Sequence, residues 1–390
     1  MKFDGMRAVS EARAQGGREQ AVGLQGHGEQ GGGNASRRAG RGLRAVAMTA
    51  LAAWLGLSAL PAAAQDAVSP ERCARNKAAG TITFLTSFAY AASAGILDVV
   101  AARDLGYFKA LCLDVALEPG STNTQLVSAG TAQMAGLGGA SDVLVAVDHG
   151  ADLVGVATYG NVGAIELLTM ADSDIKTLKD FAGKTVGYKG AIPPQFLAMF
   201  LDAGLAGDAV NWVSVGYDPI ILPNGNVDGL AAYKSNEPKA LAAKGYKIRE
   251  WDPDAFGVHS TFNTLVANRR FAEANPTAVE DFLRATFKAF AWINESPANL
   301  DKALAAAAAL STSGYDLETS KVRWGVEMDL IAKSLPKGMA VGQQSIAQWT
   351  PEAETLARFK LIGTPDIARA QDNRYIDAVV KDGAVVWPAP

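Results

Sequence analysis

Short apolar strand patterns alternate with helical patterns along most of this chain, and this alternation restricts the fold more than any other feature. Residues 81–85 form a β-branched strand pattern, apolar side chains follow at helical spacing over residues 97–105, and Gly106 stands where that helix would end. Alternation of this kind predicts an α/β fold of parallel sheets built from βαβ units. The other predicted strands lie at residues 113–117, 134–137, 153–157, 165–170, 185–188, 210–215 and 227–232.

The pattern becomes helical after residue 270. Asn275 and Pro276 predict the start of a long amphipathic helix that ends before Pro297. We therefore expect two α/β lobes followed by a helical C-terminal portion. Its further helices are predicted over residues 298–310, 316–334 and 351–360.

The first 64 residues have the organisation of a leader followed by a secretory signal peptide. Residues 1–36 are rich in Gly, Gln, Arg and Glu and are predicted to be unstructured. Basic residues, an apolar run at 45–60 and small residues up to Ala64 then follow, which predicts cleavage after Ala64 and an exported, periplasmic protein. The alternative is a membrane anchor, but that needs about 20 apolar residues, more than this run supplies.

Charge is divided unevenly between this leader and the rest of the chain. Residues 1–64 carry eight Lys and Arg against four Asp and Glu, a balance of +4. The remaining residues carry 28 against 36, a balance of −8. An acidic protein repels phosphate backbones, so the composition argues against nucleic-acid binding.

The sequence has two cysteines, Cys73 and Cys112, and both follow the predicted cleavage site. An oxidising compartment favours a disulfide between them. Their spacing is not that of a metal site, and no histidine lies nearby in the sequence. The alternative is two buried free thiols.

Sequence signatures of catalysis are incomplete in this chain. Residues 183–185, Gly-Lys-Thr, resemble the end of a phosphate loop, but Leu178 stands where that loop needs its first glycine. Residues 136–141 lack the last glycine of a dinucleotide fingerprint, and residues 91–95 lack the first glycine of a nucleophile elbow. We therefore expect a protein without catalytic residues, metal or cofactor.

Polar and aromatic side chains follow several predicted strands at the point where each strand ends. In open α/β sheets, ligands bind beyond the carboxyl ends of the strands and next to helix N-termini. A single Ser or Asn at such a position is more often a loop or cap residue, but the recurrence after successive strands predicts a shared cleft. The candidate ligand-binding residues from these segments are Phe88, Tyr90, Ser121, Ser141, Tyr159, Asn161 and Tyr188.

Two motifs resemble those of periplasmic substrate-binding proteins of ABC importers. Residues 104–109, Asp-Leu-Gly-Tyr-Phe-Lys, followed by Leu-Asp-Val at 113–115, are similar to the opening of these proteins. Residues 178–188 are similar to the entry of their second lobe. The resemblance covers about residues 80–310.

The resemblance implies a hinged, two-lobed periplasmic binding protein fold of type II, with segments 159–162 and 257–262 as the connections that form the hinge. Such a protein is a monomer that binds a small molecule and delivers it to the transmembrane permease of an ABC importer. The expected division is lobe 1 at residues 80–160 and 258–355, lobe 2 at 161–257, and a C-terminal extension at 356–390.

A third motif concerns the branch of the family. Residues 227–230, Tyr233 and the Asn236, Glu237, Pro238 element resemble the branch that binds thiamine-pyrimidine precursors and, in some members, riboflavin. Tyr233, Asn236 and Glu237 are therefore candidate ligand-binding residues. The local pattern alone equally predicts a helix start, with Asn236 as cap and Glu237 in the first turn.

Glu237 also leads to an expectation about the ligand. An ionised carboxylate accepts strong hydrogen bonds from N–H donors, and Phe88 with the candidate tyrosines could enclose a flat ring. We therefore expect an aminopyrimidine or flavin-like ligand. A sulfonate, nitrate or taurine ligand, as in neighbouring branches of the family, would instead need cations or amide donors, and Lys189 is the one cation expected near the cleft.

The same family includes a eukaryotic thiamine-pyrimidine synthase, which consumes one of its own histidines together with iron and pyridoxal phosphate. A synthase is therefore the alternative to a binding protein. That enzyme has its donor histidine in the first helix region and a cysteine-rich iron motif, whereas residues 91–98 contain no histidine here and neither cysteine lies in a cluster. A periplasmic sensor with the same lobes is a third alternative.

Overall fold

The computed structural model describes residues 68–190, 192–206, 208–312 and 314–390, all of which belong to one compact unit, Leu60–Pro390. The predicted leader and signal peptide, with cleavage after Ala64, lie outside the described residues. Within the described ranges, no helix is long and apolar enough to cross a membrane.

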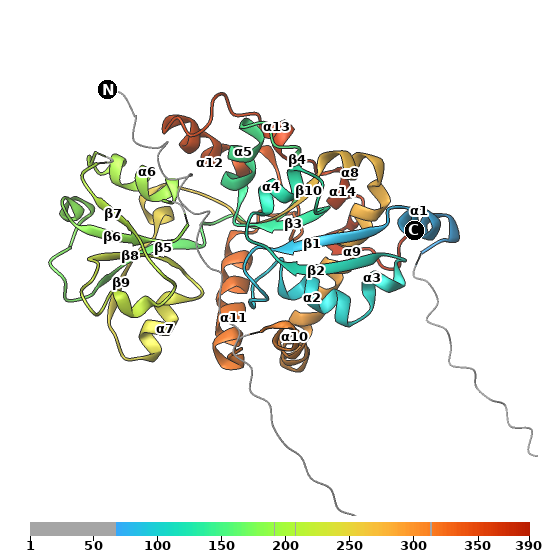
Figure 1. Cartoon of the computed structure of the whole chain (residues 1–390), viewed down its shortest axis with the longest axis horizontal. Coiled ribbons are helices and arrows are strands. Elements are labelled where there is room, and N and C mark those ends of the chain that lie inside the picture. Colours follow the sequence, from blue (N-terminus) through green and yellow to red (C-terminus); the bar gives the residue numbers. More distant parts are fainter. Residues whose placement is uncertain (1–67, 191, 207, 313) are drawn as a thin grey trace, which may run out of the picture. The chain divides into compact units, whose positions relative to one another are not determined.

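The first sheet contains β1 (Thr81–Thr86), β2 (Asp114–Pro119), β3 (Met134–Leu137), β4 (Leu153–Gly160) and β10 (Phe262–Asn268). Its strand order is β2-β1-β3-β10-β4, as Figure 1 shows. β1 is parallel to β2 and β3, whereas β10 is antiparallel to β3 and β4.

The second sheet contains β5 (Ile165–Met170), β6 (Thr185–Tyr188), β7 (Asn211–Ser214), β8 (Gly229–Tyr233) and β9 (Ile248–Trp251). Its strand order is β7-β6-β8-β5-β9. β6 is parallel to β7 and β8, whereas β5 is antiparallel to β8 and β9. The chain therefore leaves the first sheet after β4 and returns to it at β10.

The α/β fold agrees with the prediction, but both sheets are mixed instead of parallel. The antiparallel strands are β5 and β10, which lie where the chain changes sheet. The sequence analysis missed β9 and β10. β10 is buried along its whole length, as expected for a strand inside the sheet. It was not predicted because Asn263, Thr264 and Asn268 interrupt its apolar pattern.

Helices connect the strands and make up most of the C-terminal portion. Before β10 these are α1 (Pro70–Ala78), α2 (Leu97–Asp104), α3 (Tyr107–Ala110), α4 (Asn123–Ser128), α5 (Ala140–Asp148), α6 (Pro194–Asp202) and α7 (Glu237–Ala243), with the short 3-10 helices η1 (Leu178–Phe181), η2 (Pro219–Ile221) and η3 (Pro253–Phe256). After β10 these are α8 (Arg269–Ala274), α9 (Pro276–Glu295), α10 (Pro297–Leu310), α11 (Leu317–Ser334), α12 (Ile346–Arg358), α13 (Ile367–Ala370) and α14 (Arg374–Asp377), followed by the hairpin β11 (Val380–Lys381) and β12 (Ala384–Val385).

The predicted helix ends are correct where capping residues are recognisable. Gly106 has a φ of +75°, the left-handed conformation expected just after α2. α12 begins at Ile346 instead of the predicted residue 351, because the Ser345 hydroxyl caps it by accepting a hydrogen bond from the Gln348 backbone N–H at 3.2 Å. Pro351 therefore lies inside the helix.

Helices cover both faces of the first sheet, because successive side chains of a strand point to opposite faces. Phe84 of β1 stacks on Phe282 of α9 with ring centroids 5.3 Å apart. The next residue, Leu85, packs in a separate cluster with Val143 of α5 and Trp349 of α12. This packing fixes the carboxyl end of β1, from which the next loop extends.

Cys73 and Cys112 form the predicted disulfide, which joins α1 to the segment after α3. An ion pair holds the same helix to α9, because Arg72 donates to Asp281 at 2.7 Å and to Glu280 at 2.6 Å. α1 is thus attached to the first sheet's helical layer by covalent and ionic contacts together.

Candidate functional site

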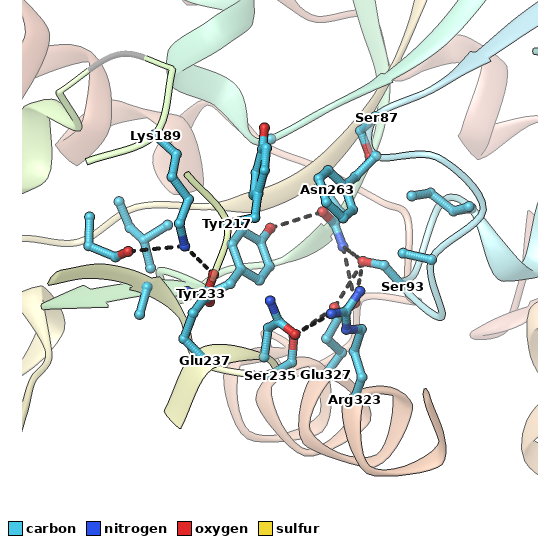
Figure 2. Close-up of a pocket in the computed structure, with 18 of the residues that line it drawn as sticks. Ser87, Ser93, Lys189, Tyr217, Tyr233, Ser235, Glu237, Asn263, Arg323 and Glu327 are labelled. Atoms are coloured by element: carbon cyan, nitrogen blue, oxygen red, sulfur yellow. Dashed lines mark hydrogen bonds and ion pairs between the residues drawn. The ribbon is translucent and has the colours of Figure 1, made fainter. Parts of the chain in front are cut away.

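A cavity of about 300 Å³ lies at the carboxyl ends of strands from both sheets and against helix α11. Loops after β1, β3, β6, β7 and β8 contribute to it, as expected for ligand sites in open α/β sheets. Figure 2 shows Tyr217 and Tyr233 near its centre, Lys189 and Glu237 on one side, and Arg323 and Glu327 on the other. The polar or aromatic lining residues are Ser87, Phe88, Ser93, Lys189, Tyr217, Tyr233, Ser235, Asn236, Glu237, Asn263, Arg323 and Glu327.

Glu327 is a fully buried carboxylate in the cavity wall. Ser93 donates to both of its oxygens at 2.8 and 2.9 Å, and the Ala94 backbone N–H donates at 2.9 Å. From other elements, Ser235 donates at 3.1 Å and Asn263 at 3.2 Å. Burial raises the pKa of Glu327, an effect that these donors oppose. Because Ser93 follows β1 and Ser235 follows β8, this carboxylate links residues that belong to the two sheets.

Arg323 lies one helical turn before Glu327 and is half-buried. One of its guanidinium nitrogens donates to Asn236 Oδ1. A guanidinium has five N–H donors in a planar fork that matches carboxylate, sulfonate or phosphate oxygens. Within the described ranges, Arg323 has no carboxylate within ion-pair distance; the paired arginines there are Arg72, Arg270, Arg284, Arg358 and Arg374.

Glu237 is the first residue of α7 and also lines the cavity. It is therefore both the helix-start residue and the cleft residue that the two interpretations predicted. Its Oε1 forms an ion pair with Lys189, and its Oε2 accepts a hydrogen bond from the Tyr233 backbone N–H at 2.8 Å. Only 3% of its side-chain surface is exposed. Asn236 stands at the cap position, but its side chain bonds Arg323 instead of the helix.

Aromatic side chains line the rest of the cavity. Phe88 and Tyr217 are 48% and 66% exposed, and their ring centroids are 5.6 Å apart. Lys189 Nζ lies 5.9 Å from the centroid of the Tyr217 ring. Tyr233 is enclosed, its hydroxyl donates to Asn263 Oδ1 at 3.3 Å, and burial raises its pKa.

The structure brings four of the predicted site residues together in this cavity: Phe88, Tyr233, Asn236 and Glu237. Ser121 and Ser141 line a neighbouring, wider cleft of about 1190 Å³, which shares Ser87 and Gly138 with the cavity. The remaining candidates, Tyr90, Tyr159, Asn161 and Tyr188, line neither of the two.

The four that do not line either site have structural contacts instead. Tyr159 is fully buried, and its hydroxyl donates to Asp98 at 2.5 Å. The Tyr90 hydroxyl donates to the Leu117 carbonyl of β2 at 3.1 Å. The Tyr90 and Tyr159 hydroxyls thus bond within the protein, and neither ring is part of the cavity lining that contains Phe88.

Asn161 and Tyr188 stand at the ends of β4 and β6 as predicted, but they do not line the cavity. Asn161 Oδ1 accepts a hydrogen bond from Gln348 of α12 at 2.6 Å. The Tyr188 ring packs edge-on against Trp212 with centroids 6.3 Å apart. A strand-end position is thus a weak guide to the direction of a single side chain.

A second buried carboxylate, Glu352 of α12, bonds Ser141, which lines the wider cleft. It accepts hydrogen bonds from the Ser141 and Thr261 backbone N–H groups, both at 3.0 Å, and from both hydroxyls. Burial raises the pKa of Glu352. Glu352 therefore occupies donors at the start of α5 that a bound anion would otherwise use.

Four cavity residues were not predicted from the sequence: Tyr217, Asn263, Arg323 and Glu327. Arg323 and Glu327 lie on a C-terminal helix far along the chain from the strand ends, and no strand-end pattern identifies them. Their spacing of four residues places both on one helical face, which was the available signal. Asn263 belongs to β10, the strand that was not predicted.

The synthase alternative requires a cluster of side chains that can hold iron. In the part of the chain that the structure describes, no group of three or more His, Cys, Asp or Glu could hold a metal ion. Both cysteines are in the disulfide, and His259 is exposed and contacts Asp254 at 2.9 Å.

A family model described as NMT1/THI5 like matches residues 93–300, more than half of the chain. The matched range includes the cavity loops after β3, β6, β7 and β8, but it begins after Phe88 and ends before α11. A search of curated proteins finds no match.

Solved structures show the same fold at low sequence identity. The alkanesulfonate-binding protein SsuA from Xanthomonas axonopodis pv. citri, bound to MOPS, is 16% identical with a TM-score of 0.57, over 75% of this chain and 98% of that one. The aliphatic sulphonate binding protein SsuA from Escherichia coli is 17% identical with a TM-score of 0.56, over 74% and 91%. The desulfurization enzyme DszB is 14% identical with a TM-score of 0.52, over 76% and 98%. The fold is that of periplasmic binding proteins.

Proposed function

Because the chain belongs to the NMT1/THI5-like family and has the periplasmic binding protein fold, we propose that it is an extracytoplasmic solute-binding protein for a small organic anion. The ligand occupies the cavity beside α11, with its anionic group against Arg323. The protein then delivers it to the permease of an ABC importer. The signal-peptide pattern before Ala64 supports export, and N-terminal sequencing of secreted protein should begin at Gln65.

The observation that carries the proposal is the state of the charged groups in the cavity. Four groups, Ser93, Ala94, Ser235 and Asn263, donate hydrogen bonds to the two oxygens of Glu327, and Glu237 is neutralised by Lys189. Arg323 has an acceptor at Asn236 but no carboxylate within ion-pair distance among the described residues. A half-buried guanidinium in a cavity gains most from an anion, because charge-assisted hydrogen bonds are the stronger ones.

The expectation of an aminopyrimidine or flavin-like ligand depended on a free Glu237 carboxylate. Both of its oxygens already have donors, Lys189 and the Tyr233 backbone N–H. An amino-heterocycle would have to compete with an ion pair for this acceptor. The geometry therefore favours the alternative weighed from the sequence, a ligand of the sulfonate or taurine class, and the sulfonate binders of the same fold support that choice.

The proposal is of binding without turnover, and the DszB enzyme shows that the fold alone does not decide this point. Incubation of the protein with iron, pyridoxal phosphate and candidate ligands tests the synthase alternative. Unchanged intact mass and full recovery of the ligand are expected. Mass loss from a histidine, or conversion of the ligand, would instead support an enzyme.

Titration calorimetry on protein that has been unfolded and refolded to remove ligand tests the ligand class. The panel is benzenesulfonate, ethanesulfonate, taurine, nitrate, 4-aminopyrimidine and riboflavin. We expect an organic sulfonate to bind and Arg323→Ala to weaken it by about tenfold or more, the range of a hydrogen bond to a charged group. The matched control is Arg270→Ala, an exposed arginine paired with Asp152. Tight riboflavin or aminopyrimidine binding, or equal affinity in Arg323→Ala, would contradict the proposal.

A further inference from the structure

Two large aromatic side chains at the cavity are exposed without a structural reason. Phe88 is 48% exposed and Tyr217 is 66% exposed, and both line the cavity. Isolated exposed aromatics are common on protein surfaces, but these two contact one another. Among described residues, the Tyr217 hydroxyl has no hydrogen-bond partner, and its ring contacts Phe88 and Lys189.

The two rings come from different sheets. Phe88 lies in the loop after β1 of the first sheet, and Tyr217 lies in the loop between β7 and η2 of the second. The Phe88 loop continues through Ala89, whose φ of +43° is unfavourable for a residue with a side chain. Strain of this kind is found where the surrounding structure holds a loop in a functional position.

The spacing of the rings decides how they could contact a ligand. Their centroids are 5.6 Å apart and their planes are inclined by 53°. A ligand ring inserted between them would need about 7 Å, twice the usual van der Waals separation of about 3.5 Å. The two rings are therefore too close to admit a ligand ring between them, and a ligand ring would have to contact them from the cavity side, where Tyr233 and Ile96 also line the cavity.

The size of the cavity agrees with a ligand of one ring. At about 300 Å³ it is at the lower limit of small-molecule pockets, which suits a single ring with an anionic substituent. Figure 2 shows Arg323 on the opposite side of Tyr233 from Lys189. One ligand could therefore place its anionic group at Arg323 and its ring at the aromatic side chains.

We propose that Phe88 and Tyr217 form an aromatic lid that makes the protein selective for ring-bearing anions over alkyl anions of the same charge. This inference rests on the proposed function, and it names the substrate class within it. Edge-to-face or offset contact with the lid adds to the hydrophobic gain of burying a ring, whereas an alkyl chain makes only the hydrophobic contact. Phe88 and Tyr217 lie in loops of different sheets, so a ligand contacts both rings only when these two loops lie close together.

Calorimetry with benzenesulfonate and ethanesulfonate tests the lid, because the two probes share a sulfonate and differ in the ring. In the wild type, benzenesulfonate should bind about tenfold or more tightly, from the added ring area and aromatic contact. In the Phe88→Ala/Tyr217→Ala double variant this ratio should fall, because the aromatic contact and part of the ring burial are lost. The matched control is Tyr246→Ala, an exposed tyrosine that lines neither the cavity nor the wider cleft, in which the ratio should be retained.

The outcomes separate this inference from the function on which it rests. Equal affinity of the wild type for both probes, or an unchanged ratio in the double variant, overturns the lid while sulfonate binding stands. Benzamide, a ring without the charge, is the third probe. If benzamide binds as tightly as benzenesulfonate and loses affinity in the double variant, the lid stands and the anion proposal fails.

Discussion

Two side chains on one face of α11 have different relations to the cavity. Glu327 is saturated with donors and holds loops from both sheets, so its contribution is to position Ser93 and Ser235. Arg323, one turn earlier, keeps donors available toward the cavity. We therefore assign Glu327 a structural role and Arg323 the proposed ligand-binding role.

Glu166 of β5 is a buried carboxylate without such partners. It is 3% exposed, and its Oε1 has no hydrogen-bond partner among the described residues. Burial, and then the nearby Glu250 carboxylate, raise the pKa of Glu166 from 4.5 to about 8. Between these two values the folded state holds a proton that the unfolded state has lost, so the unfolding free energy decreases as the pH rises through this interval.

We therefore predict that Glu166→Gln is more stable than the wild type at pH 8.5, by about 1–3 kcal/mol, the usual penalty for an unsatisfied buried polar group. The difference should shrink as the pH falls below 4.5, where the wild-type carboxyl becomes protonated in the unfolded state as well. Urea unfolding at several pH values measures it, with the exposed Glu354→Gln as control. A wild type that is equally stable or more stable than Glu166→Gln at pH 8.5 would contradict the assigned protonation.

At the scale of elements, α1 is held to the rest of the protein by the Cys73–Cys112 disulfide and by the ion pairs of Arg72. The disulfide closes a loop with a sequence separation of 39 residues. Cross-linking a loop of this length restricts the unfolded chain, and in the entropy model the restriction is worth about 4 kcal/mol.

The Cys73→Ser/Cys112→Ser double variant should accordingly unfold at lower urea concentration, with a loss of about 2–4 kcal/mol. Its affinity for the sulfonate probe should be retained, because neither cysteine lines the cavity. Reduction of the wild type with a thiol should reproduce the shift. Equal stability of oxidised wild type and double variant would show that the disulfide does not constrain the unfolded chain.

At the scale of the whole molecule, the chain crosses between the sheets twice, after β4 and before β10. Two connections are a natural hinge, and we propose that residues 159–162 and 257–262 act as one. Contacts between residues of the two sheets close the cavity, among them the Phe88 ring on Tyr217 and the Tyr233 hydroxyl on Asn263. A ligand that joins both sides would favour this arrangement.

Small-angle scattering should therefore show a smaller radius of gyration when benzenesulfonate saturates the protein. The refolded, ligand-free protein gives the reference, and Arg323→Ala at the same probe concentration serves as control and should compact less. An identical radius with and without saturating probe would count against the hinge.

Much of the fold was predictable because local rules determine it. The strands at residues 165–170 and 185–188 and the glycine-ended α2 follow from periodicity and capping. β10 was not predictable in this way, since Asn263 and Thr264 are polar residues buried by partners distant in the sequence.

Of the cavity residues, the sequence pattern predicted only those that lie at the ends of strands. Phe88, Tyr233, Asn236 and Glu237 lie there and line the cavity. Arg323 enters it from a helix whose approach depends on tertiary packing, and the direction of Tyr159 depends on Asp98. Side-chain direction and long-range contacts are therefore the information that the sequence pattern lacked.

The most direct test of the central claim is a crystal structure with 4-bromobenzenesulfonate, in which anomalous scattering locates the bromine. We predict sulfonate oxygens within hydrogen-bond distance of the Arg323 guanidinium and the bromine beneath Phe88 and Tyr217. A probe bound in the wider cleft beside Ser121, or a sulfonate that contacts Lys189 and leaves Arg323 with Asn236 alone, would contradict the account.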